Sequence, residues 1–138
     1  MLTALITSAA LGTAAAGHTA QTVIHFTVRV SSARFHVTDV PPNGPSAGDS
    51  FQESNSPPRA AALRRQDAIG IATFQRATVL GTITLKNGQI VYAGTIKNQD
   101  NAVYAILGGT GTYNAARGTL TVRALPQGRA EITIRLTE

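Results

Sequence analysis

The 138-residue chain contains no cysteine. That absence excludes disulfide bonds, thiolate metal ligands and a cysteine nucleophile together. Charged residues are also scarce, at 14%, whereas 43% of the residues are hydrophobic, which excludes disorder over most of the chain. Helix-forming segments with charged faces are few, and threonine, valine, isoleucine and glycine abound. Length and composition together predict one all-β domain with a sizeable core.

Acidic residues are the rarer charged type, seven against twelve basic ones, and the net charge is +5. An excess of this size makes nucleic-acid binding one interpretation to consider. However, the arginines occur singly through the expected strands, and alternation is expected to scatter them over both faces of the sheet. The one adjacent pair, Arg64-Arg65, has no aromatic ladder on which bases would stack. We therefore expect a solvated basic surface and no nucleic-acid partner.

Residues 1–20 contain no aspartate, glutamate, lysine or arginine and are rich in alanine, leucine, threonine and isoleucine. The run Ala14–Ala16 supplies a small-x-small cleavage pattern, so this segment is interpreted as a secretory signal peptide and the mature protein as secreted and extracellular. The alternative interpretation is a buried helix. Residues 21–138 are expected to form the single folded domain, and no further segment is long enough to span a membrane.

Apolar and polar residues alternate with a period of two over most of residues 21–138, which predicts β-strands. In the first segment, Gln21 to Val30, the side chains of Ile24, Phe26 and Val28 share one face. Residues 31–49 lose this period and carry prolines, so we expect a loop over one mouth of the fold. Further strands are expected over residues 49–55, 67–75, 76–86, 89–97, 103–107, 115–124 and 129–137. Asn87-Gly88 predicts a type I′ hairpin turn. Eight strands at meander spacing predict an antiparallel β-barrel able to hold one small ligand.

A glycine-rich run, Gly108–Gly111, divides two of the expected strands. No Gly-Lys-Ser/Thr follows it and the next segment is strand-like rather than helical, so it does not match a phosphate-binding loop. The glycines are instead interpreted as a tight corner of the barrel.

The segment Leu107–Gly118 reads Leu-Gly-Gly-Thr-Gly-Thr-Tyr-Asn-Ala-Ala-Arg-Gly and resembles the hallmark of the dirigent and allene oxide cyclase superfamily. Upstream, Gly48–Asn55 is similar to the cyclase segment that begins Gly-Asp and has an asparagine seven residues after its glycine. Gly70–Thr73 resembles the short glycine-led strand that follows. The resemblance implies a small, calycin-like antiparallel barrel with a central apolar cavity. It also implies a homo-oligomer, a dimer or a trimer.

In the cyclases, the asparagine of the Gly-Asp segment helps to hold a water that binds the substrate's epoxide oxygen, and Asn55 matches that position. This chain departs from the cyclase pattern in having no acid on its first strand and Arg76 near the cysteine position. In the dirigent pattern an arginine precedes the glycine-containing strand, and this chain has Ala102 there instead. The resemblance therefore predicts the scaffold rather than either family's own reaction.

Residues that could carry chemistry form two groups. Asp49, Glu53 and Asn55, near one mouth of the expected barrel, are the candidate catalytic cluster, and turn or strand-cap hydrogen bonding is the alternative for Asp49 and Asn55. His25, Tyr92 and Tyr104 are the candidate substrate-binding walls, and ordinary packing is the alternative for the tyrosines.

The three histidines, at positions 18, 25 and 36, lack metal-motif spacing, so we expect no metal site and no cofactor.

The function expected from the scaffold is binding of a small hydrophobic molecule. A barrel that excludes water can hold a flexible apolar substrate folded and favour ring closure. This could extend to a cofactor-independent cyclase or isomerase, or to a dirigent-like stereochemical guide. The alternative is a non-catalytic secreted carrier or interaction protein. An open pocket facing the Asp49, Glu53 and Asn55 cluster would favour the enzyme, whereas a filled interior would favour the alternative.

Overall fold

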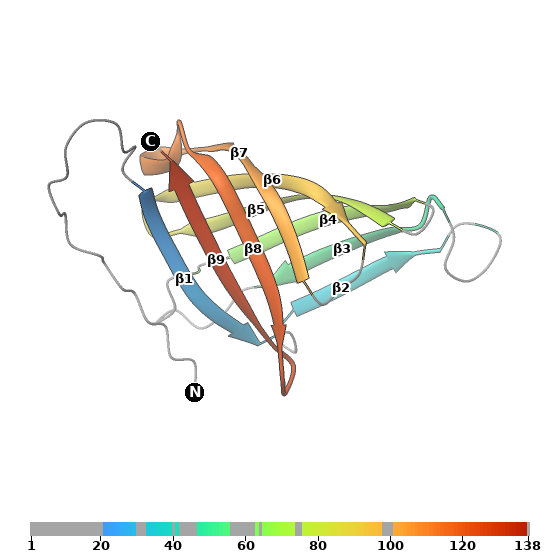
Figure 1. The fold of residues 1–138 in the computed structure, drawn as a ribbon. Coiled ribbons are helices and arrows are strands. Elements are labelled where there is room, and N and C mark those ends of the chain that lie inside the picture. Colours follow the sequence, from blue (N-terminus) through green and yellow to red (C-terminus); the bar gives the residue numbers. More distant parts are fainter. Residues whose placement is uncertain are drawn as a thin grey trace, which may run out of the picture.

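Nine antiparallel strands form one sheet in the computed structural model (Figure 1). The structure describes residues 21–29, 33–39, 41, 47–55, 63, 65–73, 76–97 and 101–137. The strands are β1 (Gln21–Arg29), β2 (Ala33–Thr38), β3 (Ser50–Asn55), β4 (Arg65–Thr73), β5 (Arg76–Leu85), β6 (Gly88–Ile96), β7 (Asn101–Gly109), β8 (Arg117–Leu125) and β9 (Arg129–Thr137), with a short 3-10 turn, η2 (Gly111–Tyr113), before β8. Their order in the sheet is β1-β9-β8-β7-β6-β5-β4-β3-β2.

The predicted all-β antiparallel fold is confirmed, with two differences. The structure has nine strands rather than eight, because β2 lies inside the segment 31–49 that was expected to be a loop. Residues 33–38 carry no proline or glycine, and the prolines that suggested a loop all lie beyond them. Over the described residues β1 and β2 do not pair, so the sheet is open where a closed barrel was expected. The expected signal peptide, residues 1–20, lies outside the described residues.

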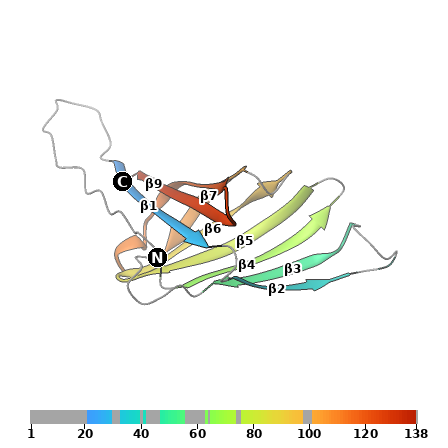
Figure 2. The same cartoon turned by 90° about the horizontal axis from the view of Figure 1, so that it is seen from below.

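The sheet curls into two facing leaves (Figure 2), with β2 to β5 in one and β1 and β9 in the other. Alternation decides which side chains lie between the leaves, as the sequence pattern predicted for three strands. The inner residues are Ile24, Phe26 and Val28 on β1, Val79, Gly81, Ile83 and Leu85 on β5, and Ala130, Ile132, Ile134 and Leu136 on β9. In the described part of the chain, no helix is long and apolar enough to cross a membrane.

Large aliphatic side chains fill one end of the space between the leaves. Ile83, Ile90, Leu120 and Ile134 are each fully buried there. Each such side chain contributes about 2 kcal/mol of hydrophobic stabilisation. Further along the same strands the inner positions become small, and alanine occupies several of them. The interior is therefore solid at one end and less filled at the other.

The predicted glycine corner closes the solid end. The amide of Thr110 donates to the carbonyl of Gln89 at 2.9 Å, and the amide of Thr112 donates to that of Asn87 at 3.1 Å. A β-carbon on Gly109 would lie 2.0 Å from the carbonyl oxygen of Gln89, so only glycine permits this approach. The run thus serves as a corner, as the sequence indicated.

The β5–β6 hairpin forms where it was expected, but the predicted turn is wrong by one residue. Lys86 and Asn87 make the connection, since Leu85 pairs with Gly88. A type I′ turn needs positive φ at both central residues, and neither Lys86 nor Asn87 has it. Gly88, with a φ of 150°, is needed instead because its backbone packs against Thr110.

The β8–β9 loop contains a strained residue. Gln127 has a φ of 64°, and the following Gly128 has a φ of 65°. A side chain in this left-handed region costs about 1 kcal/mol, and glycine does not incur that cost. We expect Gln127→Gly to raise the melting temperature by a few degrees, measured by circular dichroism. Gln89→Gly, which replaces a glutamine in extended β6 backbone, should lower it. A lower melting temperature for Gln127→Gly would show that the Gln127 side chain stabilises the loop.

Candidate functional site

A cavity of about 430 Å³ occupies the less filled end of the space between the leaves. Its volume lies within the usual range for small-molecule sites. Most of its wall is apolar, and five alanines keep it wide: Ala68, Ala72, Ala102, Ala124 and Ala130. The polar residues that line it are Asp49, Ser50, Glu53, Gln66, Tyr92, Tyr104 and Arg129. An apolar chamber with a few polar groups is the usual form of a ligand site.

One cross-strand row sets the geometry of the polar groups. Glu53 on β3 pairs with Ala68 on β4, Ala68 pairs with Gly81 on β5, and Gly81 pairs with Tyr92 on β6. No large side chain separates Glu53 from Tyr92 along this row. A β-carbon on Gly81 would lie 2.3 Å from Cζ of Tyr92, so the ring lies across the glycine. The tyrosine hydroxyl thereby reaches toward β4 and β3.

The position of the Tyr92 hydroxyl is fixed by a buried amide. Nε2 of Gln66 on β4 donates to the hydroxyl oxygen of Tyr92 at 3.2 Å. Because the hydroxyl oxygen accepts this bond, its own proton is available to a ligand. Gln66 was not among the residues singled out from the sequence. The signal for its inward position is the alternation of small residues that follows it, Ala68, Gly70 and Ala72.

Tyr104 on β7 completes the floor of the cavity beside Tyr92. The two ring centroids lie 5.1 Å apart with the planes tilted by 56°, a favourable aromatic arrangement. A β-carbon on Gly94 would lie 3.0 Å from Cδ1 of Tyr104, so this ring also packs beside a glycine. The register of β6 and β7 shifts between Val91 and Tyr92. Such an irregularity re-aims the neighbouring side chains.

Burial shapes the protonation of all three acidic groups. Desolvation raises the pKa of the Glu53 carboxyl above its ordinary value of 4.5. Burial also raises the pKa of Tyr92 strongly and that of Tyr104 to about 12, and the charge of Glu53 adds to both shifts. The two phenols therefore remain neutral hydrogen-bond donors, and Glu53, with a raised pKa, is the group best suited to hold or release a proton.

Backbone hydrogen bonds to Ala72, near the end of β4, hold Asp49 at the wall of the cavity. The amide of Gly48 donates to the carbonyl of Ala72 at 2.8 Å, and the amide of Ala72 donates to that of Asp49 at 2.6 Å. Gly48 has a φ of 101°, which favours glycine there. Arg129, at the start of β9, lines the same cavity.

The structure brings together four of the six residues singled out from the sequence: Asp49, Glu53, Tyr92 and Tyr104 line one cavity. His25 lies apart, on the outer side of β1, where its Nε2 is 2.6 Å from Oε1 of Glu131. Asn55 ends β3 opposite Gln66, and its side chain lies outside the described part. No group of three or more metal-ligating side chains occurs among the described residues.

No protein-family model matches the sequence, and no curated protein matches it either. Solved structures do match. The chain is similar to a pyocyanin demethylase, with a TM-score of 0.69 and 19% identity over 86% of this chain and 100% of that one. It is similar to the Diels-Alderase AbmU from Streptomyces koyangensis, with a TM-score of 0.67 and 15% identity over 89% of this chain and 70% of that one. A pterocarpan synthase dirigent protein matches with a TM-score of 0.59 and 14% identity over 89% and 86% of the two chains.

One of these neighbours is named a dirigent protein, so the expected resemblance is confirmed at the level of the fold. The chain shares with them an all-β antiparallel architecture.

The raised pKa of Glu53 predicts how the stability of the fold depends on pH. The folded chain holds the Glu53 proton more tightly than the unfolded chain, so stability falls as pH rises from 4.5 through the folded pKa. We expect Glu53→Gln to melt at a higher temperature than the parent chain at pH 7. Below pH 4.5 the difference should disappear.

Asp67→Asn is the control with the opposite sign. The hydrogen bond from Arg65 lowers the pKa of Asp67, so its contribution is present above pH 3.8 and is lost as pH falls through the folded pKa. Asp67→Asn should therefore melt lower than the parent at pH 7. If Glu53→Gln also melts lower at pH 7, the Glu53 carboxylate is stabilised in the fold and is not the perturbed acid described above.

Proposed function

We propose that the cavity binds a small, largely apolar molecule and promotes its cyclisation or isomerisation without a cofactor. One observation carries this proposal: an apolar chamber of about 430 Å³ in which Glu53 faces two neutral tyrosines. The criterion set from the sequence was an open pocket facing the acidic cluster. Asp49 and Glu53 line this pocket, and the side chain of Asn55 lies outside the described part, so two of the three cluster residues support the enzyme over a carrier with a filled interior.

The proposed chemistry needs few groups. The hydroxyls of Tyr92 and Tyr104 donate hydrogen bonds to a substrate oxygen on which negative charge develops, and in a dry cavity such bonds are strong. The Glu53 carboxyl donates or accepts the proton that an isomerisation moves. The apolar wall holds the substrate folded, so that its reacting carbons meet without a further loss of entropy. Asp49 is proposed to contact the substrate's polar end, and the role of Asn55 stays a prediction from the sequence.

The structural neighbours support a cyclase or a stereochemical guide. Two of them are named Diels-Alderases, which form rings, and one is named a pterocarpan synthase dirigent protein. Their identity to this chain is low, so they support the class of reaction and not a substrate.

Ligand binding in the cavity is tested with a neutral apolar dye, N-phenyl-1-naphthylamine, whose fluorescence rises in dry surroundings. We expect the parent chain to enhance its fluorescence. Ala102→Phe places a ring in the cavity and should abolish the enhancement, because Ala102 lines the wall. Ala105→Phe is the matched control on the exposed side of the same strand and should leave it intact. Equal enhancement by both variants would place the dye elsewhere.

Catalysis is tested with the molecule that co-purifies with the protein, identified by native mass spectrometry. We expect the parent chain to convert this molecule or its acyclic precursor, and Glu53→Gln to bind it without converting it. If the parent chain leaves both compounds unchanged, the protein is a carrier. Conversion by Glu53→Gln at the parent rate would exclude Glu53 as the acid or base.

Two further expectations stay predictions. Secretion rests on residues 1–20, which lie outside the described part. A homo-oligomer would cover apolar side chains that are exposed on the outer side of the sheet. These include Ile69, Ile71 and Leu80 on β4 and β5 and Val103 and Leu107 on β7. Sedimentation velocity measures this state directly.

A further inference from the structure

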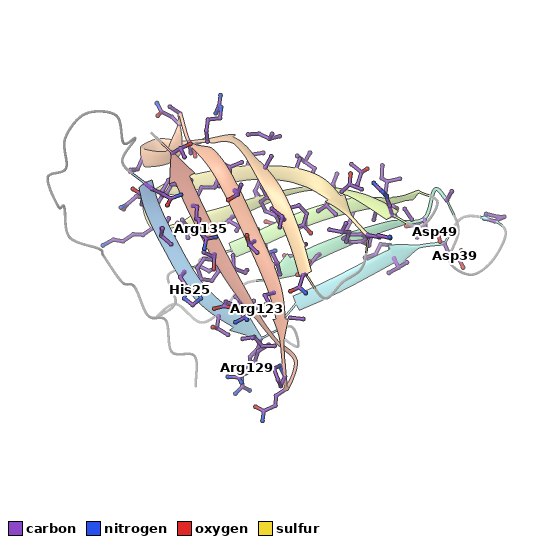
Figure 3. All side chains as sticks on the ribbon, viewed as in Figure 1. His25, Asp39, Asp49, Arg123, Arg129 and Arg135 are labelled. Atoms are coloured by element: carbon purple, nitrogen blue, oxygen red, sulfur yellow. The ribbon has the colours of Figure 1, made fainter. Side chains whose placement is uncertain are left out.

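The outer side of β1, β9 and β8 collects positive charge. On these strands the even-numbered side chains, such as Phe26, Leu120 and Ile132, are buried against the interior, so the odd-numbered ones point outward. The arginines occupy odd positions, and all are exposed: Arg29, Arg117, Arg123, Arg129 and Arg135. These five residues are called the cationic face. Arg129, at the start of β9, also lines the cavity described above. Figure 3 shows three of them, Arg123, Arg129 and Arg135, on the side of the sheet toward the viewer.

The expectation that alternation scatters the arginines is therefore wrong. Alternation within each strand, combined with the antiparallel register, places them together. The sequence showed that the arginines share one side of each strand, but it did not show the register between β1, β9 and β8. Five of the ten arginines lie on this face, whereas Arg65 and Arg76 lie on β4 and β5, so the condition for a nucleic-acid interface is met in part.

One carboxylate faces these arginines on the described outer side of the three strands. Glu131 accepts a hydrogen bond from Nε of Arg123 at 2.7 Å, and its other oxygen lies 2.6 Å from Nε2 of His25. The contacts with His25 and Arg123 hold the pKa of Glu131 below its ordinary value. Among the described residues, this face therefore carries more arginines than carboxylates.

Two of the arginines face each other. Arg29 on β1 lies directly opposite Arg129 on β9 in the register. Like charges in directly opposed positions destabilise a sheet. A phosphate oxygen pair matches the planar fork of a guanidinium group.

The surroundings of the arginines distinguish between classes of polyanion. Threonine hydroxyls fill the positions between them: Thr27, Thr119, Thr121 and Thr133. No phenylalanine, tyrosine or tryptophan stands on the described outer side of these strands, and His25, the one aromatic ring there, is paired with Glu131. This disfavours base stacking and single strands. Val23 is the one large apolar residue exposed there, which gives little to insert into a bilayer.

The spread of the charges favours a duplex over a single anionic thread. The arginines occupy three adjacent strands, so they extend across about 10 Å as well as along about 26 Å of strand. A thread would meet one line of them, whereas a duplex presents two lines of phosphates. We propose that the cationic face binds the phosphate backbone of double-stranded nucleic acid without reading its base sequence.

The test measures fluorescence anisotropy of a labelled 24-base-pair DNA duplex between 50 and 200 mM salt. Three to four phosphate contacts predict that log K falls against log salt with a slope of about −3. Arg123→Gln/Arg135→Gln should weaken binding at least about tenfold at 100 mM salt and make the slope shallower by about 2. Lys86→Gln/Lys97→Gln removes the same charge from exposed positions elsewhere and should leave the slope unchanged.

A third variant tests the opposite direction. Glu131→Gln removes the carboxylate from the cationic face and should tighten binding several-fold. A second duplex of unrelated sequence should bind equally well. These results together support the proposal, and thermal melts confirm that each variant is folded.

Several results would overturn it. Equal weakening by the two double variants would mean that net charge rather than this face attracts DNA. Tighter binding to a single strand than to the duplex would require a stacking site. Binding to heparin or to phosphatidylserine vesicles without binding to the duplex would assign the face to a polysaccharide or a membrane.

Discussion

The packing of an aromatic ring against a glycine on the neighbouring strand is the interaction on which the interior depends. Tyr92 lies across Gly81, Tyr104 packs beside Gly94, and a β-carbon on Gly70 would lie 2.2 Å from Cζ of Phe51. Because each ring lies along the wall, large aromatic surface is buried without blocking the chamber. The same arrangement carries the Tyr92 hydroxyl to Gln66 and toward Glu53. Stability and site geometry therefore have one origin in these strands.

The two sides of the sheet follow different rules. Inward positions are graded in size, from isoleucine and leucine at the solid end to alanine around the cavity. Outward positions are graded in charge, with arginine and threonine on β1, β9 and β8 and exposed aliphatic side chains such as Ile69 and Leu80 on β4 and β5. A strand with a period of two can vary both properties independently, since neighbouring residues never share a side. The proposed ligand and polyanion sites occupy opposite sides of the same strands.

The alternation of apolar and polar residues along each strand made much of this fold predictable from the sequence. The inward residues of β1, β5 and β9 were identified correctly, and so were the glycine corner and the presence of the β5–β6 hairpin. The register between strands distant in sequence was not accessible, because nothing local specifies that Arg29 meets Arg129 or that Glu53 shares a row with Tyr92. Gln66 and the collected arginines were missed for that reason. His25 was considered as a cavity wall, but its odd position on β1 places it on the outer side beside Glu131.

The strand order also determines the sequence in which the strands can pair during folding. Every pair from β2–β3 to β8–β9 joins neighbours in sequence, whereas β1 pairs with β9 across the whole domain, with Gln21 opposite Thr137. Closing a loop of this length has a larger entropic cost than forming a hairpin, so the hairpins can assemble first and β1 docks last. During synthesis β1 emerges before the other described strands, and it can pair only after β9 has been made. Since the two ends of the described domain then lie side by side, a short linker could join them and new termini could be opened at the Lys86-Asn87 turn.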